Sequence, residues 1–129
     1  MSTIQPYSGQ LNPPAPALDI FLSRPDGFDW DGPYLAMLDS GADMTIVPLS
    51  MVRSLGAPVY DQVVLISQWG DRYPMHLYQV DIQIAGIVLP VISVAGDAHS
   101  NEVLLGRNVL NRLDLRLEGP KLRTHILGE

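Results

Sequence analysis

Short apolar segments, separated by glycine, proline and polar turns, recur along the whole chain and restrict the folds open to it. The 129 residues include 11 Gly and 11 Pro, and both are spread through the sequence. Gly and Pro punctuate turns, and apolar runs this short are typical of strands. Because 47% of the residues are hydrophobic, a packed core is expected rather than disorder. The pattern predicts an all-β domain, closed or partly closed, with one or two short helices.

The apolar runs define the predicted elements. Strands are predicted over residues 18–22, 34–38, 45–47, 59–66, 75–84, 87–94, 103–105, 115–117 and 122–127. Short helices are predicted over 48–55, where proline suits the start, and over 107–113, where apolar residues recur at helical spacing. The polar, proline-rich segment 1–16 is predicted to be a flexible arm, which leaves 17–129 as the domain.

Several classes of function lack support in the sequence. The net charge is -6 and no Lys/Arg cluster is present, so we expect no nucleic-acid partner. Cysteine is absent, the histidines share no ligand spacing, and no phosphate-binding glycine loop occurs, so we expect no metal and no cofactor. The N-terminus resembles no signal peptide, and the longest apolar stretch, 84–95, is too short for a membrane span. A soluble, cytoplasmic protein is the expectation.

One acidic residue occupies an unusual place. Asp39 follows the apolar run 35–38 and precedes Ser40 and Gly41. A carboxylate at the end of a buried strand is costly unless hydrogen bonds satisfy it, and Gly41 gives a neighbour room to approach. These features favour a working acid. The same tripeptide also fits an ordinary turn between strands, and the residues alone leave both interpretations open.

Two motifs together suggest a family. Leu-Asp-Ser-Gly-Ala-Asp at 38–43 is followed about sixty residues later by Leu-Leu-Gly-Arg-Asn-Val-Leu at 104–110. In this order and at this separation, the pair resembles the retroviral protease (retropepsin) family. The resemblance covers residues 18–117 and implies the small closed, β-barrel-like retropepsin (acid protease) fold. The hairpin near 69–72 falls where that family has its flap.

The resemblance implies an aspartic endopeptidase that works as a homodimer on a peptide or protein substrate. Asp39 carboxylates from two chains would share a proton and activate a water molecule. The residues implied for catalysis are Asp39, Ser40 and Gly41. Those implied for substrate binding are Gly41, Ala42, Asp43, Trp69 and Gly70. Those implied to support the site are Asp43, Arg107 and Gly106, the first two as an ion pair within one chain.

Alternatives remain at three points. Asp43 and Arg107 also fit two unrelated surface charges, and Trp69 fits either a lid over substrate or an exposed hairpin aromatic. The flap segment 67–72 contains one glycine, whereas the family usually has a glycine-rich tip. A peptide-binding or dimerisation module with little or no protease activity is therefore the alternative function. For either function, the resemblance implies a dimer in which terminal strands of the two chains interleave. Residues 113–117 and 122–127 are the candidate strands for this interface.

Overall fold

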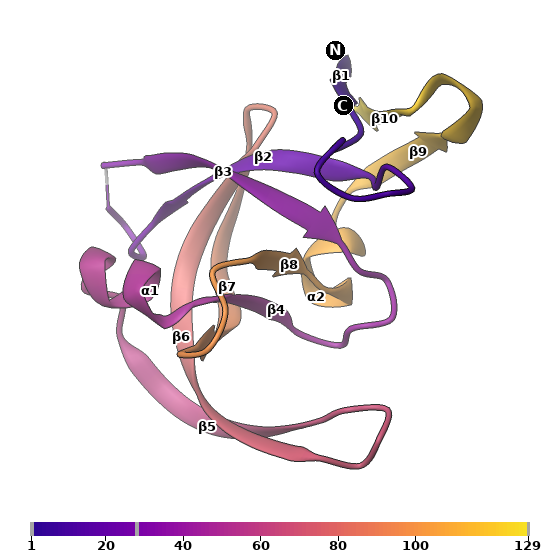
Figure 1. Cartoon of the computed structure of the whole chain (residues 1–129). Helices are drawn as coiled ribbons and strands as arrows, with labels where there is room; N and C mark the ends of the chain where they lie inside the picture. The colour runs from indigo at the N-terminus through magenta and orange to yellow at the C-terminus, as the bar shows by residue number, and fades with distance from the viewer. Residues whose placement is uncertain (1, 28, 129) are drawn as a thin grey trace.

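A computed structural model describes residues 2–27 and 29–128, and most of them lie in strands (Figure 1). The strands are β1 (Ser2–Pro6), β2 (Ala17–Ser23), β3 (Asp31–Leu38), β4 (Thr45–Pro48), β5 (Val59–Ile66), β6 (Arg72–Ile84), β7 (Ile87–Asp97), β8 (Val103–Leu105), β9 (Asp114–Glu118) and β10 (Arg123–Leu127). The helices are α1 (Leu49–Leu55) and α2 (Arg107–Leu110), with one 3₁₀ turn, η1 (Gly119–Lys121). The prediction of an all-β domain with short helices is confirmed.

Six strands close into a barrel. They follow the order β2-β3-β8-β4-β7-β6, and β6 pairs back with β2. Most neighbours are antiparallel, but β3 runs parallel to β8, and β4 runs parallel to β7. Strand β5 lies outside the closed barrel and extends from the other side of β6 as a long hairpin. Closure removes open edges from the barrel, as the sequence led us to expect.

Alternation along the strands fills the barrel. In β2, Leu18, Ile20 and Leu22 are fully buried, whereas Asp19 between them is exposed. Successive side chains of a strand point to opposite faces, so these three residues share the inner face. Val80, Ile82 and Ile84 of β6 are buried in the same way. Leu38, the last residue of β3, packs against this core, and Asp39 begins the loop that follows.

The helices are short and mark the ends of barrel strands. Helix α1 ends at Gly56, whose φ of +68° suits a glycine that stops a helix. Helix α2 covers residues 107–110 rather than the predicted 107–113. It tightens into i→i+3 bonds, from Arg112 N–H to Val109 O and from Leu113 N–H to Leu110 O, before β9 begins. Neither helix, in the part of the chain that the structure describes, is long and apolar enough to cross a membrane.

A second, three-stranded sheet carries both ends of the chain. Its order is β1-β10-β9, with Ser2 opposite Leu127 (Figure 1). Residues 2–6 were expected in a flexible arm, but they form β1 because β10 offers an edge whose backbone groups need partners. The Gln5 side chain also accepts a hydrogen bond of 2.7 Å from Asp19 N–H on β2. The division of the chain at residue 16 stays a prediction.

Candidate active site

Asp39 begins the loop that leaves β3. Its backbone N–H donates to Leu105 O at 3.0 Å, which continues the parallel pairing of Leu38 with Leu105. Its carboxylate Oδ1 accepts the Gly41 N–H at 3.1 Å, and its carbonyl accepts the Ala42 N–H at 3.1 Å. Asp39 is half-buried, while the following Ser40 and Gly41 are exposed. The backbone of Asp39 is therefore fixed at the rim of the core, and its carboxyl group is oriented by one hydrogen bond while it remains open to solvent.

Arg107 fastens the second half of this loop. Its Nη1 donates to Ser40 O at 2.8 Å, its Nη2 pairs with the Asp43 carboxylate, and its backbone N–H donates to Ala42 O at 2.8 Å. Asp43 and Arg107 thus contact each other rather than standing apart. Both side chains are substantially exposed, at 87% and 44%, so the ion pair adds little to stability. Its effect is to fix the shape of the loop against α2.

Gly106 brings the end of β8 against the loop. A Cβ atom here would lie 2.5 Å from both C and O of Met44 and 2.9 Å from Thr45 N. Only glycine allows this approach of two backbones. Gly41 is less restricted, because its φ is not positive and an added Cβ would meet only Asp39 Oδ1 at 3.3 Å. The special backbone geometry of this site therefore lies at Gly106.

Two polar residues that the sequence did not single out connect the loop to the barrel. The amide oxygen of Asn108 accepts bonds from Thr45 N–H at 3.0 Å and Thr45 Oγ1 at 2.8 Å. The Thr45 hydroxyl in turn accepts Gly106 N–H at 3.0 Å, and Asn108 Nδ2 donates to Ser93 O at 2.8 Å. Thr45 is completely buried. A threonine beside two apolar β-branched residues was the available signal, since a buried hydroxyl needs partners.

Removing the Thr45 hydroxyl is expected to destabilise the fold. Thr45→Val keeps the branched shape but leaves the Gly106 N–H without an acceptor, so we expect a loss of about 2 kcal/mol in the free energy of unfolding. Thr45→Ser keeps the hydroxyl and loses one methyl group, for a loss of about 1 kcal/mol. Urea unfolding of both variants measures the difference. A valine variant no less stable than the serine variant would contradict the role assigned to the hydroxyl.

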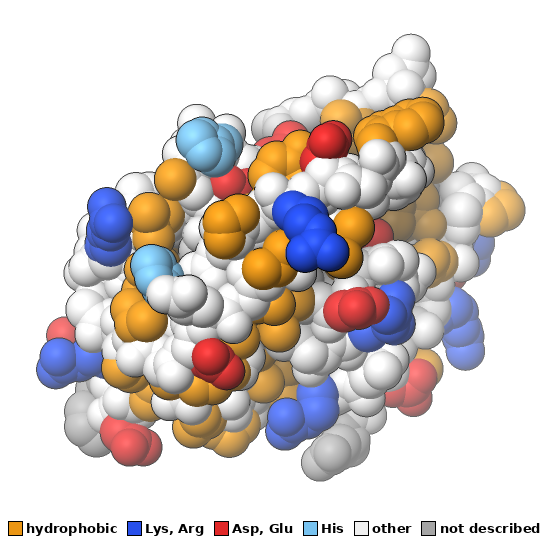
Figure 2. Space-filling view, turned by 90° about the horizontal axis from the view of Figure 1, so that it is seen from below, with side chains coloured by type: hydrophobic (Ala, Val, Ile, Leu, Met, Phe, Trp, Pro, Cys, Tyr) orange, Lys and Arg blue, Asp and Glu red, His pale blue; other side chains and the backbone are white. Residues whose placement is uncertain are grey.

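The hairpin between β5 and β6 ends in a turn held by a serine. Ser67 Oγ accepts the N–H groups of Trp69 and Asp71, each at 3.2 Å, and Gly70 adopts a φ of +84°. The Trp69 side chain is 81% exposed, and Ile66 beside the turn is 64% exposed. Figure 2, seen from the side on which the hairpin lies in Figure 1, shows apolar side chains spread across this face. In a single chain the hairpin thus exposes apolar surface.

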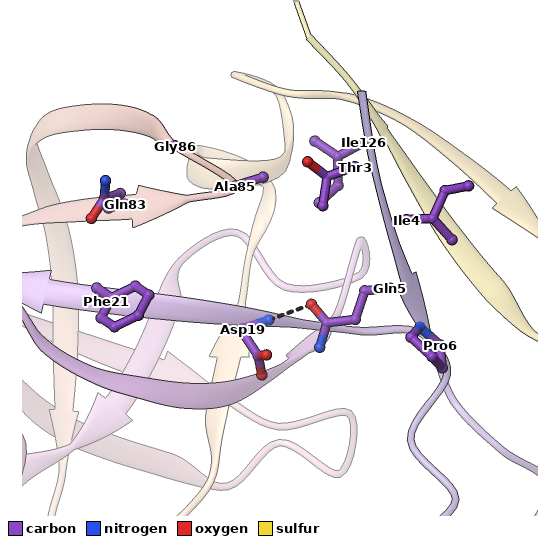
Figure 3. Close-up of a pocket in the computed structure, with 10 residues that line it drawn as sticks. All are labelled: Thr3, Ile4, Gln5, Pro6, Asp19, Phe21, Gln83, Ala85, Gly86 and Ile126. Atoms are coloured by element: carbon purple, nitrogen blue, oxygen red, sulfur yellow. Dashed lines mark hydrogen bonds between the residues drawn. The ribbon is translucent and has the colours of Figure 1, made fainter. Parts of the chain in front are cut away.

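One chain brings together most, but not all, of the predicted site residues. The loop 39–43 contacts Arg107 and lies against Gly106, whereas Trp69 and Gly70 belong to the separate hairpin. Among the described residues no cluster of acidic residues, His and Cys could hold a metal ion. A cavity of about 450 Å³ elsewhere, between β1, β2 and the β6–β7 turn, contains none of the loop residues (Figure 3). Of the two carboxylates in this loop, Asp43 is paired with Arg107, so among the described residues Asp39 is the one without an ion-pair partner.

A closed six-stranded barrel with an Asp-Ser-Gly loop at the end of β3 and a Gly-Arg-Asn turn packed on it defines the retropepsin-like class. The model of the family described as "gag-polyprotein putative aspartyl protease" matches residues 31–112, from the start of β3 through α2. The match spans more than half of the chain, so the protein belongs to this family of retropepsin-like aspartic proteases. No curated protein matches the chain in sequence.

Solved structures share the fold at low sequence identity. A retropepsin-like aspartic protease from Rickettsia conorii is 14% identical, with a TM-score of 0.62, and the match covers 98% of this chain and 90% of that one. The EIAV protease in complex with the inhibitor HBY-793 is 20% identical, with a TM-score of 0.59, covering 76% of this chain and 86% of that one. The simian foamy virus (mac) protease is 17% identical, with a TM-score of 0.52, and the match covers 74% of this chain and 91% of that one. These similarities confirm the predicted fold.

Proposed function

We propose that the protein is an aspartic endopeptidase that acts as a homodimer, with one Asp39 from each chain. The observation that carries the proposal is the Asp39 carboxylate itself. It stands half-exposed at the end of a core strand, oriented by Gly41 N–H, within a loop that Arg107 fastens. A single chain supplies one such carboxylate, and the chemistry of peptide hydrolysis without a nucleophilic side chain needs an acid and a base. A second copy supplies the missing group.

The chemistry follows from placing two carboxyl groups close together. Two carboxyl groups a few ångströms apart do not both ionise, because their negative charges would repel each other. The pair therefore holds one proton and titrates as a unit. The ionised carboxylate removes a proton from a bound water, which attacks the scissile carbonyl. The protonated carboxyl donates a hydrogen bond to that carbonyl oxygen and stabilises the tetrahedral intermediate. No covalent enzyme intermediate forms, and no cofactor is needed.

The substrate is an extended peptide lying between the loop and the β5–β6 hairpin. Extended peptides bind through their main-chain groups, in the manner of an added strand. Gly41, Ala42 and Asp43 supply the floor, with the Gly41 carbonyl accepting from the peptide backbone. Trp69 and Gly70 of the hairpin cover it. Ser40 bonds to its counterpart across the two-fold axis and stiffens the pair of carboxyl groups.

Dependence on concentration tests this proposal. Cleavage of a casein or peptide-library substrate is expected between acidic and neutral pH, with specific activity that falls on dilution as the dimer dissociates. Pepstatin, which occupies paired aspartates, is expected to abolish the activity. Specific activity that stays constant down to concentrations at which sedimentation shows only monomer would contradict a site shared between chains.

A second function, a peptide-binding or dimerisation module with little protease activity, is favoured by the hairpin. Gly70 is the one glycine in its tip segment, residues 67–72. The Ser67 hydroxyl accepts hydrogen bonds from the N–H groups of Trp69 and Asp71, which hold the turn in one shape. A tip held in this way closes less readily over a peptide than a glycine-rich one. Binding of peptides without cleavage in the same library assay would identify this second function.

A further inference from the structure

The three-stranded sheet β1-β10-β9 has two free edges, one at β1 and one at β9. Along the chain, β9 is the edge strand nearer to the candidate site. It pairs with β10 on one side only. Residues 111–113 alone separate it from α2, which begins at Arg107, the residue that holds the Asp39 loop. An unpaired strand edge is a template for another strand. A strand that pairs with β9 is therefore linked to the proposed catalytic loop through residues 111–113 and α2.

Strand β10 is not available for the same purpose. It already has β1 on one side and β9 on the other. The β1 strand is held within its own chain by the bond from Asp19 N–H to the Gln5 side chain at 2.7 Å, drawn in Figure 3, and by Tyr7 N–H to Leu122 O at 2.8 Å. Interleaving of terminal strands between two chains, the arrangement expected from the family, would require these bonds to break. Pairing at the outer edge of β9 leaves them intact.

We propose that two copies of this chain pair antiparallel through β9, about a two-fold axis at Leu115. This inference rests on the proposed homodimer and specifies its interface. In this register Asp114 lies opposite Arg116 of the partner subunit, and Arg116 lies opposite the partner's Asp114. Opposite charges in directly facing positions stabilise a strand pair. Among the described residues neither Asp114 nor Arg116 has an ion-pair partner within its own chain.

The apolar side chains agree with this register. Leu115 is opposite the partner's Leu115, and Leu113 is opposite the partner's Leu117. Leu117 is 56% exposed among the described residues of a single chain, so the pairing would cover apolar surface that the chain itself leaves open. Leu113 and Leu115 already pack against the barrel core, which makes the paired sheet continuous with the core of each subunit.

Other registers are less favourable. An axis at Arg116 places that residue opposite itself and Asp114 opposite the partner's Glu118, so like charges face each other. An axis at Leu117 places Asp114 opposite the partner's Pro120, which lies in the η1 turn beyond the strand. An axis between two residues sets charged side chains against leucines. Glu118 is also engaged in its own chain, with its Oε2 2.9 Å from Arg123 Nε.

The outer edge of β1 does not offer a comparable signal. Its residues, Ser-Thr-Ile-Gln-Pro, carry no charge that would fix a register. Pro6 lacks the N–H needed to continue a ladder. The sheet therefore has one edge with a charge pattern that complements itself.

Charge reversal tests the register. The measurement is the dimer dissociation constant by sedimentation, made in the Asp39→Asn background to prevent self-digestion. Asp114→Arg places two arginines opposite each other at both symmetric positions, so we expect the constant to rise about tenfold or more. Adding Arg116→Asp in the same chain restores opposite charges and is expected to return the constant to within about threefold of the starting value. Circular dichroism and thermal unfolding check that each variant folds.

The possible outcomes separate the alternatives. Tighter association of the Asp114→Arg variant would indicate the axis at Arg116, and an unchanged constant would indicate the axis at Leu117 or another surface; either result overturns the proposal. Asp19→Arg, the same charge change on the exposed face of β2, is the control and is expected to have no effect on the dimer dissociation constant.

Peptide cleavage separates this inference from the proposed function. Cleavage that needs Asp39 with no effect of Asp114→Arg on dimerisation would refute only the β9 interface. Dimers that depend on Asp114 but cleave nothing would refute only the protease.

Discussion

Replacing Asp39 by Asn is expected to abolish peptide cleavage while leaving the fold intact. The amide can neither ionise to accept a proton from water nor act as the acid of the pair, so the rate falls by about a thousandfold or more. The side chain retains its size and can still accept the Gly41 N–H, which the native Oδ1 receives at 3.1 Å. Steady-state cleavage of a peptide substrate measures the loss, and circular dichroism and urea unfolding check the fold.

The matched control and a mixing experiment sharpen this result. Asp19→Asn makes the same chemical change at an exposed position of β2 and is expected to keep full activity. When wild-type and Asp39→Asn chains are mixed in equal amounts and allowed to exchange, only dimers of two wild-type chains are active, so about a quarter of the activity per total chain remains. Loss in simple proportion to the wild-type fraction would show that each chain acts alone. Full activity of the Asp39→Asn variant would refute the role of this residue.

Gly106→Ala is expected to destabilise the protein by about 3 kcal/mol, a large part of the stability of a domain of this size. The new Cβ would stand 2.5 Å from C and O of Met44, and these are backbone atoms that no rotamer change can move aside. The loop carrying Asp39 must shift away from β8, so activity is also expected to fall at temperatures where the variant is still folded. Urea unfolding and cleavage assays on the same samples measure both effects.

Gly9→Ala provides the comparison for this variant. An added Cβ at Gly9 meets nothing within 4 Å, and the expected change in stability is below about 0.5 kcal/mol. If Gly106→Ala were equally silent, the close approach of the β8–α2 turn to residues 44 and 45 would not be required. A variant that loses stability but keeps full activity when folded would separate the role of Gly106 in packing from its role in positioning Asp39.

The strands of the barrel could be predicted because their apolar residues alternate or run together over segments bounded by turns. The same rule failed where pairing decides the length of an element. Strand β3 begins at Asp31 rather than at residue 34, because its partner β2 extends the ladder as far as the Leu22–Asp31 pair, through a segment that contains Gly32 and Pro33. Helix α2 stops at Leu110, since Leu113 continues the helical spacing but faces the core from the turn before β9.

Long-range contacts limited how much of the candidate site could be predicted from the sequence. Asp39 and Arg107 were singled out because both belong to motifs that local sequence reveals. The contact of Thr45 with Asn108 joins residues 63 positions apart and depends on three segments meeting, which periodicity does not encode. The pairing of β1 with β10 is of the same kind: a polar, proline-rich segment looked flexible because its partner strand lies at the other end of the sequence.

The neighbouring positions of the two chain ends have a consequence for larger polypeptides. Ser2 lies opposite Leu127 in one strand pair, and paired strands are separated by about 5 Å. A longer polypeptide containing this domain would therefore enter and leave it at a single point, so the domain could be inserted into a surface loop of a host protein without spreading that loop apart. For the same reason a short linker would join the ends into a circle, and the exposed Ala85-Gly86 turn offers a place to open new ones.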